Sequence, residues 1–112
     1  MLADKNLDEA GFNALADEML ASIEAALENC AIHLDYEVKP GGVLEIEFED
    51  GSKIIINRHT AAREIWIAAK SGGFHFRPDA GRWLGTRDGA ELLAALSDFI
   101  SRQSGQAVTL AL

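Results

Sequence analysis

Five residues from two neighbouring predicted elements could together ligate a metal ion: Glu24, Glu28, His33, Asp35 and Glu37. Carboxylate oxygens suit hard cations such as Ca²⁺, Mg²⁺, Mn²⁺ and iron. The spacing matches no tight site, because it contains no EF-hand loop, no His-x-x-x-His and no Glu-x-x-His. We therefore expect weak, hydrated binding at the surface, and the spacing alone identifies no specific metal.

The charge of the chain is divided unevenly. Thirteen of the 18 Asp and Glu residues lie in the first fifty positions, beside only two lysines, which gives this part a net charge of about −11. The remainder has a net charge of about +3. This division favours one strongly negative surface that attracts cations or a basic protein. Nucleic acid is not an expected partner, because phosphates require a basic groove.

Motifs for catalysis are not recognisable. The histidines have no Ser or Cys nucleophile placed near them by a motif, and the glycine pairs join predicted strands instead of opening a helix around a phosphate. Cys30 is the single cysteine, so the chain cannot form an internal disulfide or hold an iron–sulfur cluster by itself. We interpret Cys30 as structural and expect the protein not to be an enzyme.

Length and composition predict one domain over residues 1–112. The 112 residues are 48% apolar, which is enough for a single hydrophobic core. No apolar run approaches the ~20 residues of a membrane helix. The first residues do not resemble a signal peptide, and a lone cysteine suits a reducing compartment. We therefore expect a cytoplasmic protein without membrane contact.

Glu24 and Glu28 belong to a predicted helix over about residues 8–29. Apolar residues recur there every three or four positions, at Phe12, Leu15, Met19, Ile23 and Leu27. Asp17, Glu24 and Glu28 fall on the opposite side, with Glu18 beside them. For any one of these acids, a solvated helix face is the simpler explanation.

Alternating residues then predict a sheet. Strands are expected over 33–39, 44–49, 52–58, 64–70 and 74–77, with a short edge strand at 82–84, and Asp50-Gly51 is a strong hairpin signal. A second helix should follow Asp88, with Glu91 completing a capping box and Gly105 as the C-cap. Residues 107–112 are expected to lie along a helix and cover the core. The predicted class is α+β, a two-layer α–β sandwich with an antiparallel sheet of five to six strands and both helices on one face.

The opposite sheet face should then be open to solvent. The two-residue pleat assigns to it Glu45, Glu47, Glu49, Lys53, Ile55, Asn57, Glu64, Trp66, Ala68 and His75. An exposed Trp66 is costly unless something covers it, and Trp is enriched at interface hot spots. A local inversion that buries Trp66 is the alternative. We favour exposure, because Ile65 and Ile67 cannot share its face.

Residues 41–58 (GGVLEIEFEDGSKIIINR) resemble the frataxin family in its bacterial, CyaY-type form. The likeness continues through IWIA at 65–68, GGFHF at 72–76 and Trp83, and it covers about residues 12–106. It implies an α–β sandwich with a role in iron–sulfur cluster assembly. Family members bind Fe²⁺ and Fe³⁺ weakly through an acidic ridge, and they dock on the cysteine desulfurase–scaffold machinery, where bacterial members regulate the desulfurase.

Carried over by position, the resemblance implies an iron-binding surface, which we call the acidic ridge, made of Asp17, Glu18, Glu24, Glu28, His33, Asp35 and Glu37. It also implies a partner-binding sheet surface made of Glu45, Glu47, Ile55, Asn57 and Trp66. The expected partners are the cysteine desulfurase and the scaffold, and the expected state is a monomer, with iron-dependent oligomers as the alternative.

The chain departs from the family pattern at the ridge. Ala25 follows Glu24 and Asn29 follows Glu28 where family ridges often have acidic pairs, and His33 stands where an acid is frequent. These changes predict fewer or weaker iron sites, with pH-dependent ligation by His33. Two other functions stay open: a ferroxidase or iron-storage protein, which normally needs a di-iron carboxylate site, and a metal-independent acidic protein-binding module.

Overall fold

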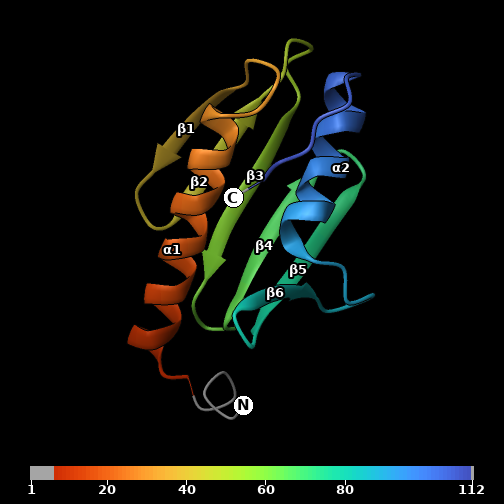
Figure 1. The fold of residues 1–112 in the computed structure, drawn as a ribbon. Coiled ribbons are helices and arrows are strands. Elements are labelled where there is room, and N and C mark those ends of the chain that lie inside the picture. Colours follow the sequence, from red (N-terminus) through yellow and green to blue (C-terminus); the bar gives the residue numbers. More distant parts are fainter. Residues whose placement is uncertain (1–6, 112) are drawn as a thin grey trace.

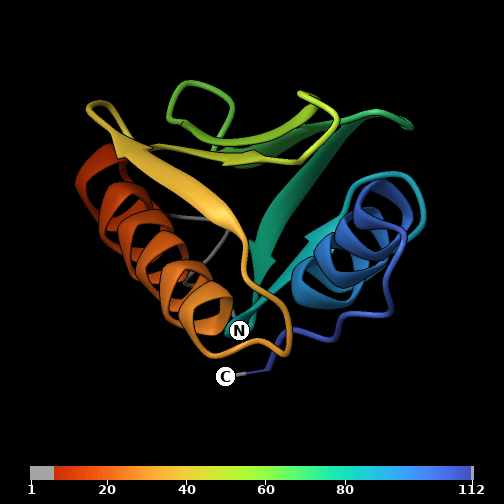
Figure 2. The same cartoon turned by 90° about the horizontal axis from the view of Figure 1, so that it is seen from above.

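Two helices pack on a six-stranded sheet in the computed structural model, which describes residues 7–111 (Figure 1). The elements are α1 (Glu9–Glu28), β1 (Asp35–Lys39), β2 (Val43–Glu47), β3 (Lys53–His59), β4 (Glu64–Ala69), β5 (Gly72–Asp79), β6 (Arg82–Gly85) and α2 (Leu92–Ser104). The sheet is an antiparallel meander in chain order. Figure 2 shows both helices on the same side of the sheet, which confirms the predicted two-layer sandwich.

The N-terminal helix forms because its apolar residues share one side. Asp8 caps it, since the Asp8 Oδ1 atom accepts a hydrogen bond from the Gly11 backbone N–H at 2.7 Å. Its buried side chains are Phe12, Ala16, Met19, Ile23, Ala26 and Leu27. The acids of α1 are therefore left at the side of the helix and on its outer surface.

The β1–β2 hairpin has a turn that favours glycine. Gly41 and Gly42 have φ angles of 87° and 78°, which residues with a Cβ adopt only with strain. A Cβ on Gly42 would also lie 2.9 Å from the Cβ of Arg58 on β3. The turn thus fixes the register in which Val38 pairs with Leu44 and Glu37 with Glu45.

The core lies between the sheet and the helices. Leu44, Ile46, Ile54, Ile56, Ile65 and Ile67 are at most 1% exposed and alternate with outward residues. Trp83 on β6 meets Phe12 on α1 edge to face, with ring centroids 6.0 Å apart. This contact links the last strand to the first helix beneath the sheet.

The segment after α2 covers the core, as predicted. Val108 and Leu110 are each 5% exposed, while Leu112 lies outside the described residues. The backbone N–H of Val108 donates to Ser101 Oγ and that of Leu110 donates to Ser97 Oγ, each at 2.9 Å. Two hydroxyls on α2 therefore hold the tail against the helix.

The predicted N-cap of α2 was wrong. Glu91 is the cap, and its carboxylate accepts hydrogen bonds from the backbone N–H groups of Leu93 and Ala94 at 3.1 Å. Asp88 instead accepts from the Ala90 N–H at 3.0 Å, within the turn that precedes the helix. Glu91 also bridges to Leu84, so the chain stays extended until the sheet contact ends. Gly105 is the C-cap, as predicted.

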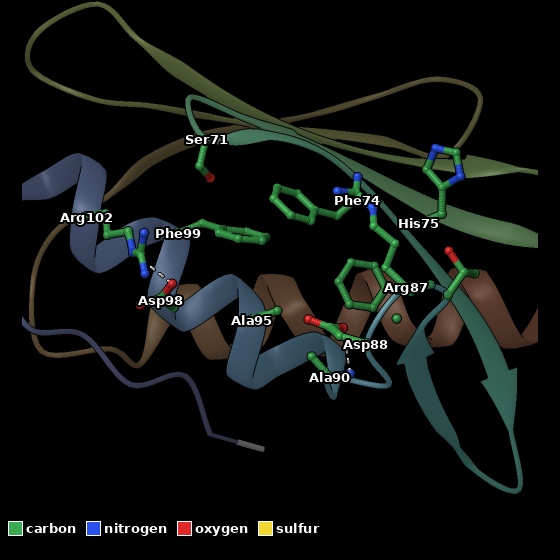
Figure 3. Close-up of a pocket in the computed structure, with 13 residues that line it drawn as sticks. Ser71, Phe74, His75, Arg87, Asp88, Ala90, Ala95, Asp98, Phe99 and Arg102 are labelled. Atoms are coloured by element: carbon green, nitrogen blue, oxygen red, sulfur yellow. Dashed lines mark hydrogen bonds and ion pairs between the residues drawn. The ribbon is translucent and has the colours of Figure 1, made fainter.

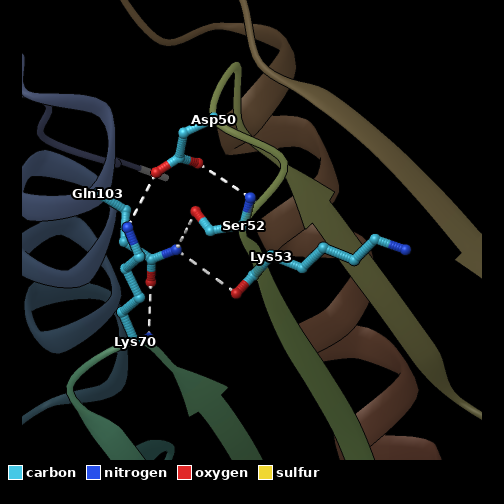
Figure 4. A network of polar contacts seen from close by, with 5 residues as sticks. All are labelled: Asp50, Ser52, Lys53, Lys70 and Gln103. Atoms are coloured by element: carbon cyan, nitrogen blue, oxygen red, sulfur yellow. Dashed lines mark hydrogen bonds and ion pairs between the residues drawn. The ribbon is translucent and has the colours of Figure 1, made fainter.

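A polar network holds one end of the sandwich together (Figure 4). Asp50 Oδ1 accepts from the Ser52 N–H at 2.9 Å, and Asp50 Oδ2 lies 2.9 Å from Lys70 Nζ. Gln103 on α2 accepts from the Lys70 N–H at 3.0 Å and donates to Ser52 Oγ at 3.1 Å. The network joins the β2–β3 turn, the β4–β5 turn and α2. Across residues 7–111, no helix has the length and apolar character needed to cross a membrane.

Candidate functional site

A groove between α1 and β1 gathers most of the acidic ridge. It is lined by five of the seven predicted residues, together with Tyr36 and neighbours: Glu24, Glu28, His33, Asp35 and Glu37. Glu28, His33, Asp35 and Glu37 are exposed, and Glu24 is partly exposed. Carboxylates from two elements therefore share one open groove, which we call the ridge groove.

The two remaining predicted ligands lie apart from this groove. Asp17 lines an adjoining hollow with Glu24 and pairs with Arg58 of β3, with Asp17 Oδ1 2.6 Å from Arg58 Nη1. Arg58 belongs to the part of the chain with a net positive charge, and its guanidinium neutralises the Asp17 carboxylate. Glu18 is exposed and does not line either hollow. The groove therefore contains five of the seven residues of the acidic ridge, and Asp17 and Glu18 lie outside it.

Tyr36 is a residue of the ridge groove that the sequence prediction missed. Its hydroxyl donates to Glu28 Oε2 at 2.7 Å and lies 3.4 Å from Glu24 Oε2. The hydrogen bond to Glu28, then burial and the charge of both carboxylates, raises the pKa of Tyr36 to about 12. The phenol therefore stays protonated and holds the two carboxylates of α1 close to one hydroxyl.

The ridge groove can attract a cation but does not enclose one. His33 Nε2 lies 3.0 Å from Asp35 Oδ1, so these two predicted ligands contact each other. Within residues 7–111, no group of three His, Cys, Asp or Glu side chains has the geometry to hold a metal ion. The donor set of the groove fits a hydrated hard cation held by one or two carboxylates.

The open sheet face lies on the other side of the sheet from the helices. On this face, one row places Asn57 opposite Trp66 and Trp66 opposite His75, and another row places Glu45 opposite Ile55. Two lysines flank Glu45, since Lys39 Nζ lies 2.8 Å and Lys53 Nζ 3.3 Å from its carboxylate. The hydrogen bond from Lys39 holds the pKa of Glu45 below its usual value. Glu47 is exposed.

Trp66 forms the centre of a three-ring stack on this face. The His59 ring lies on one side, with centroids 3.8 Å apart and planes inclined by 14°. The His75 ring lies on the other side at 4.4 Å and 10°. The two histidines thus cover much of the indole surface, and Trp66 is only partly exposed. We call His59, Trp66 and His75 the ring stack.

Glu64 anchors the ring stack from below. Its side chain is only 10% exposed, although it belongs to the outward row of β4. Glu64 Oε1 accepts from Trp66 Nε1 at 2.8 Å and lies 3.3 Å from His75 Nδ1, while Oε2 accepts from Arg77 Nε at 3.3 Å. One buried carboxylate therefore fixes the orientation of three side chains, which supports a preorganised surface.

A further cavity of about 330 Å³ lies between β5 and α2 (Figure 3). Phe74 and Phe99 stack in it with centroids 4.5 Å apart, and the Arg87 guanidinium lies 5.3 Å from the centre of the Phe74 ring. Arg87 also donates to the Gly73 carbonyl at 2.5 Å, and Arg102 pairs with Asp98 at 2.9 Å. Both arginines that line this cavity therefore already contact other groups of the protein.

Comparison with known proteins identifies the family. The model of the frataxin-like domain matches residues 5–106. The chain belongs to the frataxin family. The iron–sulfur cluster assembly protein CyaY of Dechloromonas aromatica is 59% identical over 104 residues, covering 93% of this chain and 99% of the relative. The resemblance noted in the sequence is therefore confirmed over most of the chain.

Solved frataxin structures have the same fold. Frataxin from Psychromonas ingrahamii superposes with a TM-score of 0.85 at 32% identity, covering 94% of this chain and 99% of that one. A trimeric frataxin from Saccharomyces cerevisiae, complexed with ferrous iron, gives a TM-score of 0.63 at 25% identity, covering 85% and 86%. The arrangement of helices and strands in this chain is thus that of the frataxin fold.

Proposed function

We propose that this protein is a cytoplasmic iron–sulfur cluster assembly factor that binds iron weakly and regulates a cysteine desulfurase, without being an enzyme itself. The observation that carries the proposal is the convergence of Glu24, Glu28, Asp35 and Glu37 in the open ridge groove. Like charges this close repel one another, and their field attracts a basic protein surface or a hydrated cation. The naming of CyaY relatives as iron–sulfur cluster assembly proteins supports the same role.

The two surfaces would have different partners in this role. The ridge groove would contact a basic surface of the desulfurase, with iron modulating the contact. The open sheet face would dock the iron–sulfur scaffold through Trp66, flanked by Asn57 and Ile55. Support for this division comes from charge: the groove is dominated by acids, whereas the Trp66 ring lies between His59 and His75, and the carboxylate that binds it, Glu64, is paired with Arg77.

Charge reversal in the ridge groove tests the proposal. The variant with Glu24, Glu28, Asp35 and Glu37 all changed to Lys should lose desulfurase binding by at least about tenfold, because opposite charges steer and hold such contacts. The matched control changes four exposed acids elsewhere, Glu9, Glu49, Asp79 and Asp98, to Lys, which gives the same change in net charge. Binding and desulfurase activity are measured at several iron concentrations. Equal losses in both variants would show a net-charge effect and refute the assignment of the groove.

No observation favours a second function. A ferroxidase or an iron-storage protein would need a cluster of ligands, and residues 7–111 supply no group of three. NMR titration with Fe²⁺, with Ca²⁺ as a diamagnetic control, distinguishes an iron-binding assembly factor from an acidic protein-binding module that binds no metal. Shifts confined to the ridge groove support the former.

A further inference from the structure

We propose that the ring stack and Arg77 form a recognition site for a carboxylate group of a protein partner. This inference rests on the proposed docking role of the open sheet face, and it adds the chemistry that the partner must present there. Four features of the site carry it: the orientation of the rings, the positions of the imidazole protons, the neutralisation of Glu64 and the exposure of Arg77.

The ring stack presents ring edges to the solvent. Its rings are nearly parallel and follow one another across β3, β4 and β5, so the stacking direction runs along the sheet and the ring edges point away from it. Aromatic rings are electron-rich on their faces and electron-poor at their edges. Because histidines lie on both indole faces, a cation from a partner cannot stack on Trp66, whereas an anion can approach the exposed edges.

Neighbouring groups indicate where each imidazole carries its proton when it is neutral. His75 Nδ1 lies 3.3 Å from a carboxylate oxygen of Glu64, which can only accept, and this contact favours a proton on Nδ1. His59 Nδ1 accepts from the Ala62 backbone N–H at 3.3 Å, so the His59 proton is on Nε2. His59 thus offers a donor to a partner even when neutral, and His75 has a free Nε2 atom.

The only acid in contact with this site is already neutralised. Among the described residues, the ionisable groups that contact the ring stack or one another here are Glu64 on β4 and Arg77 on β5. Arg77 donates its Nε to Glu64 while its side chain stays 68% exposed. The guanidinium therefore keeps N–H groups for a second carboxylate, and Arg forms such forked contacts well.

NMR titration with two short peptides tests the inference. The probe is acetyl-Gly-Glu-Leu-Glu-Gly-amide, and its control is the same peptide with Gln in place of Glu. The Glu peptide should shift the amides of residues 59, 66, 75 and 77 in a saturable way, because its carboxylates contact the ring edges and the Arg77 guanidinium. Arg77→Gln should weaken this binding by about tenfold, since it removes a charge-assisted hydrogen bond.

Control variants separate the site from general charge. Arg82→Gln removes another exposed cation and His33→Gln removes a histidine of the ridge groove, and both should bind the Glu peptide like the unchanged protein. Equal binding of the two peptides, shifts outside the sheet face or no saturable shift would overturn the inference. If Trp66→Ala still weakens scaffold binding in that case, the docking role stands and only the carboxylate assignment falls.

Discussion

The ridge groove and the ring stack are both open to solvent, but they are built in opposite ways. In the groove, carboxylates of like charge lie together, and the Tyr36 hydroxyl is shared between two of them. In the stack, Glu64 is surrounded by an indole N–H, an imidazole and a guanidinium. The first surface holds excess charge and little fixed geometry, whereas the second has little excess charge and well-fixed geometry.

This difference suits the ridge groove to attracting a partner from a distance and the ring stack to making a specific contact. Exposed like charges act over several ångströms and mainly raise the rate at which an oppositely charged partner arrives. Rings fixed by a buried anchor lose little conformational freedom on binding, which favours a specific contact. This chain therefore has one surface suited to long-range attraction and another suited to a specific short-range contact.

The largest expected effect comes from removing the central ring. Trp66→Ala should weaken binding to the scaffold by about 30-fold, because a Trp at an interface centre contributes ~2 kcal/mol or more. It should leave desulfurase binding within about twofold, since the ridge groove is unchanged. Calorimetry with each partner measures both, and circular dichroism checks the fold. Unchanged scaffold binding would remove Trp66 from the docking surface.

Salt should distinguish the two surfaces next. Raising ionic strength from about 0.05 M to about 0.5 M should weaken desulfurase binding by roughly tenfold, because exposed charges are screened beyond a few ångströms. Scaffold binding through Trp66 should change by less than about threefold over the same range. Surface plasmon resonance at several salt concentrations gives both slopes. Equal salt dependence of desulfurase binding and scaffold binding would contradict the assignment of the two partners to different surfaces.

The Asp50 carboxylate contacts both Ser52 and Lys70. Hydrogen bonds from Ser52, followed by the Lys70 ammonium, hold the pKa of Asp50 well below its usual range. A group whose pKa is lowered on folding adds stability above its unfolded pKa, ~3.9 for Asp, and loses it as the pH falls through the folded value. Asp50→Asn should therefore lower Tm by roughly 3 °C at neutral pH.

The difference between the unchanged protein and Asp50→Asn should shrink below about pH 4. Thermal melts across pH 2–7 follow this change, with Asp79→Asn, an exposed acid of the β5–β6 hairpin, as the control. A Tm difference that is constant over the whole pH range would show that the network in Figure 4 is not electrostatic.

The smallest expected effect has the opposite sign. Glu24→Gln should raise Tm by about 1–3 °C at low salt, because it relieves repulsion from Glu28 one helical turn away. High salt should abolish the gain and should also raise the Tm of the unchanged protein, since ions screen the groove. Differential scanning calorimetry detects such shifts. A lower Tm for Glu24→Gln would mean that its contact with Tyr36 outweighs the repulsion.

Alternation in the sequence was sufficient to predict the layers and the exposed face. Ile65 and Ile67 are buried, so Trp66 had to lie on the open side, and the register of β3, β4 and β5 agrees. Periodicity likewise predicted the buried side of α1. The start of α2 was missed, because Asp88 and Glu91 are both good caps and a bridge to Leu84 decides between them.

The contacts that organise the two surfaces could not be predicted from the sequence. Packing of His59 on Trp66 depends on the offset between two strands, and the burial of Glu64 depends on Arg77, which lies 13 residues away. The pair formed by Asp17 and Arg58 spans 41 residues. These contacts need the assembled sheet, whereas a local pattern shows only which side of a strand each residue faces.

The strand β1 lies at the edge of the sheet, where it borders both the ridge groove and the open sheet face. Glu37 lines the ridge groove and also pairs with Glu45, whose own neighbour on β3 is Ile55. Two proteins bound to the groove and to the open face would therefore meet along one strand, and engagement of the first would raise the effective concentration of the second. Two individually weak contacts can in this way hold a complex firmly, and the loss of either one releases it quickly.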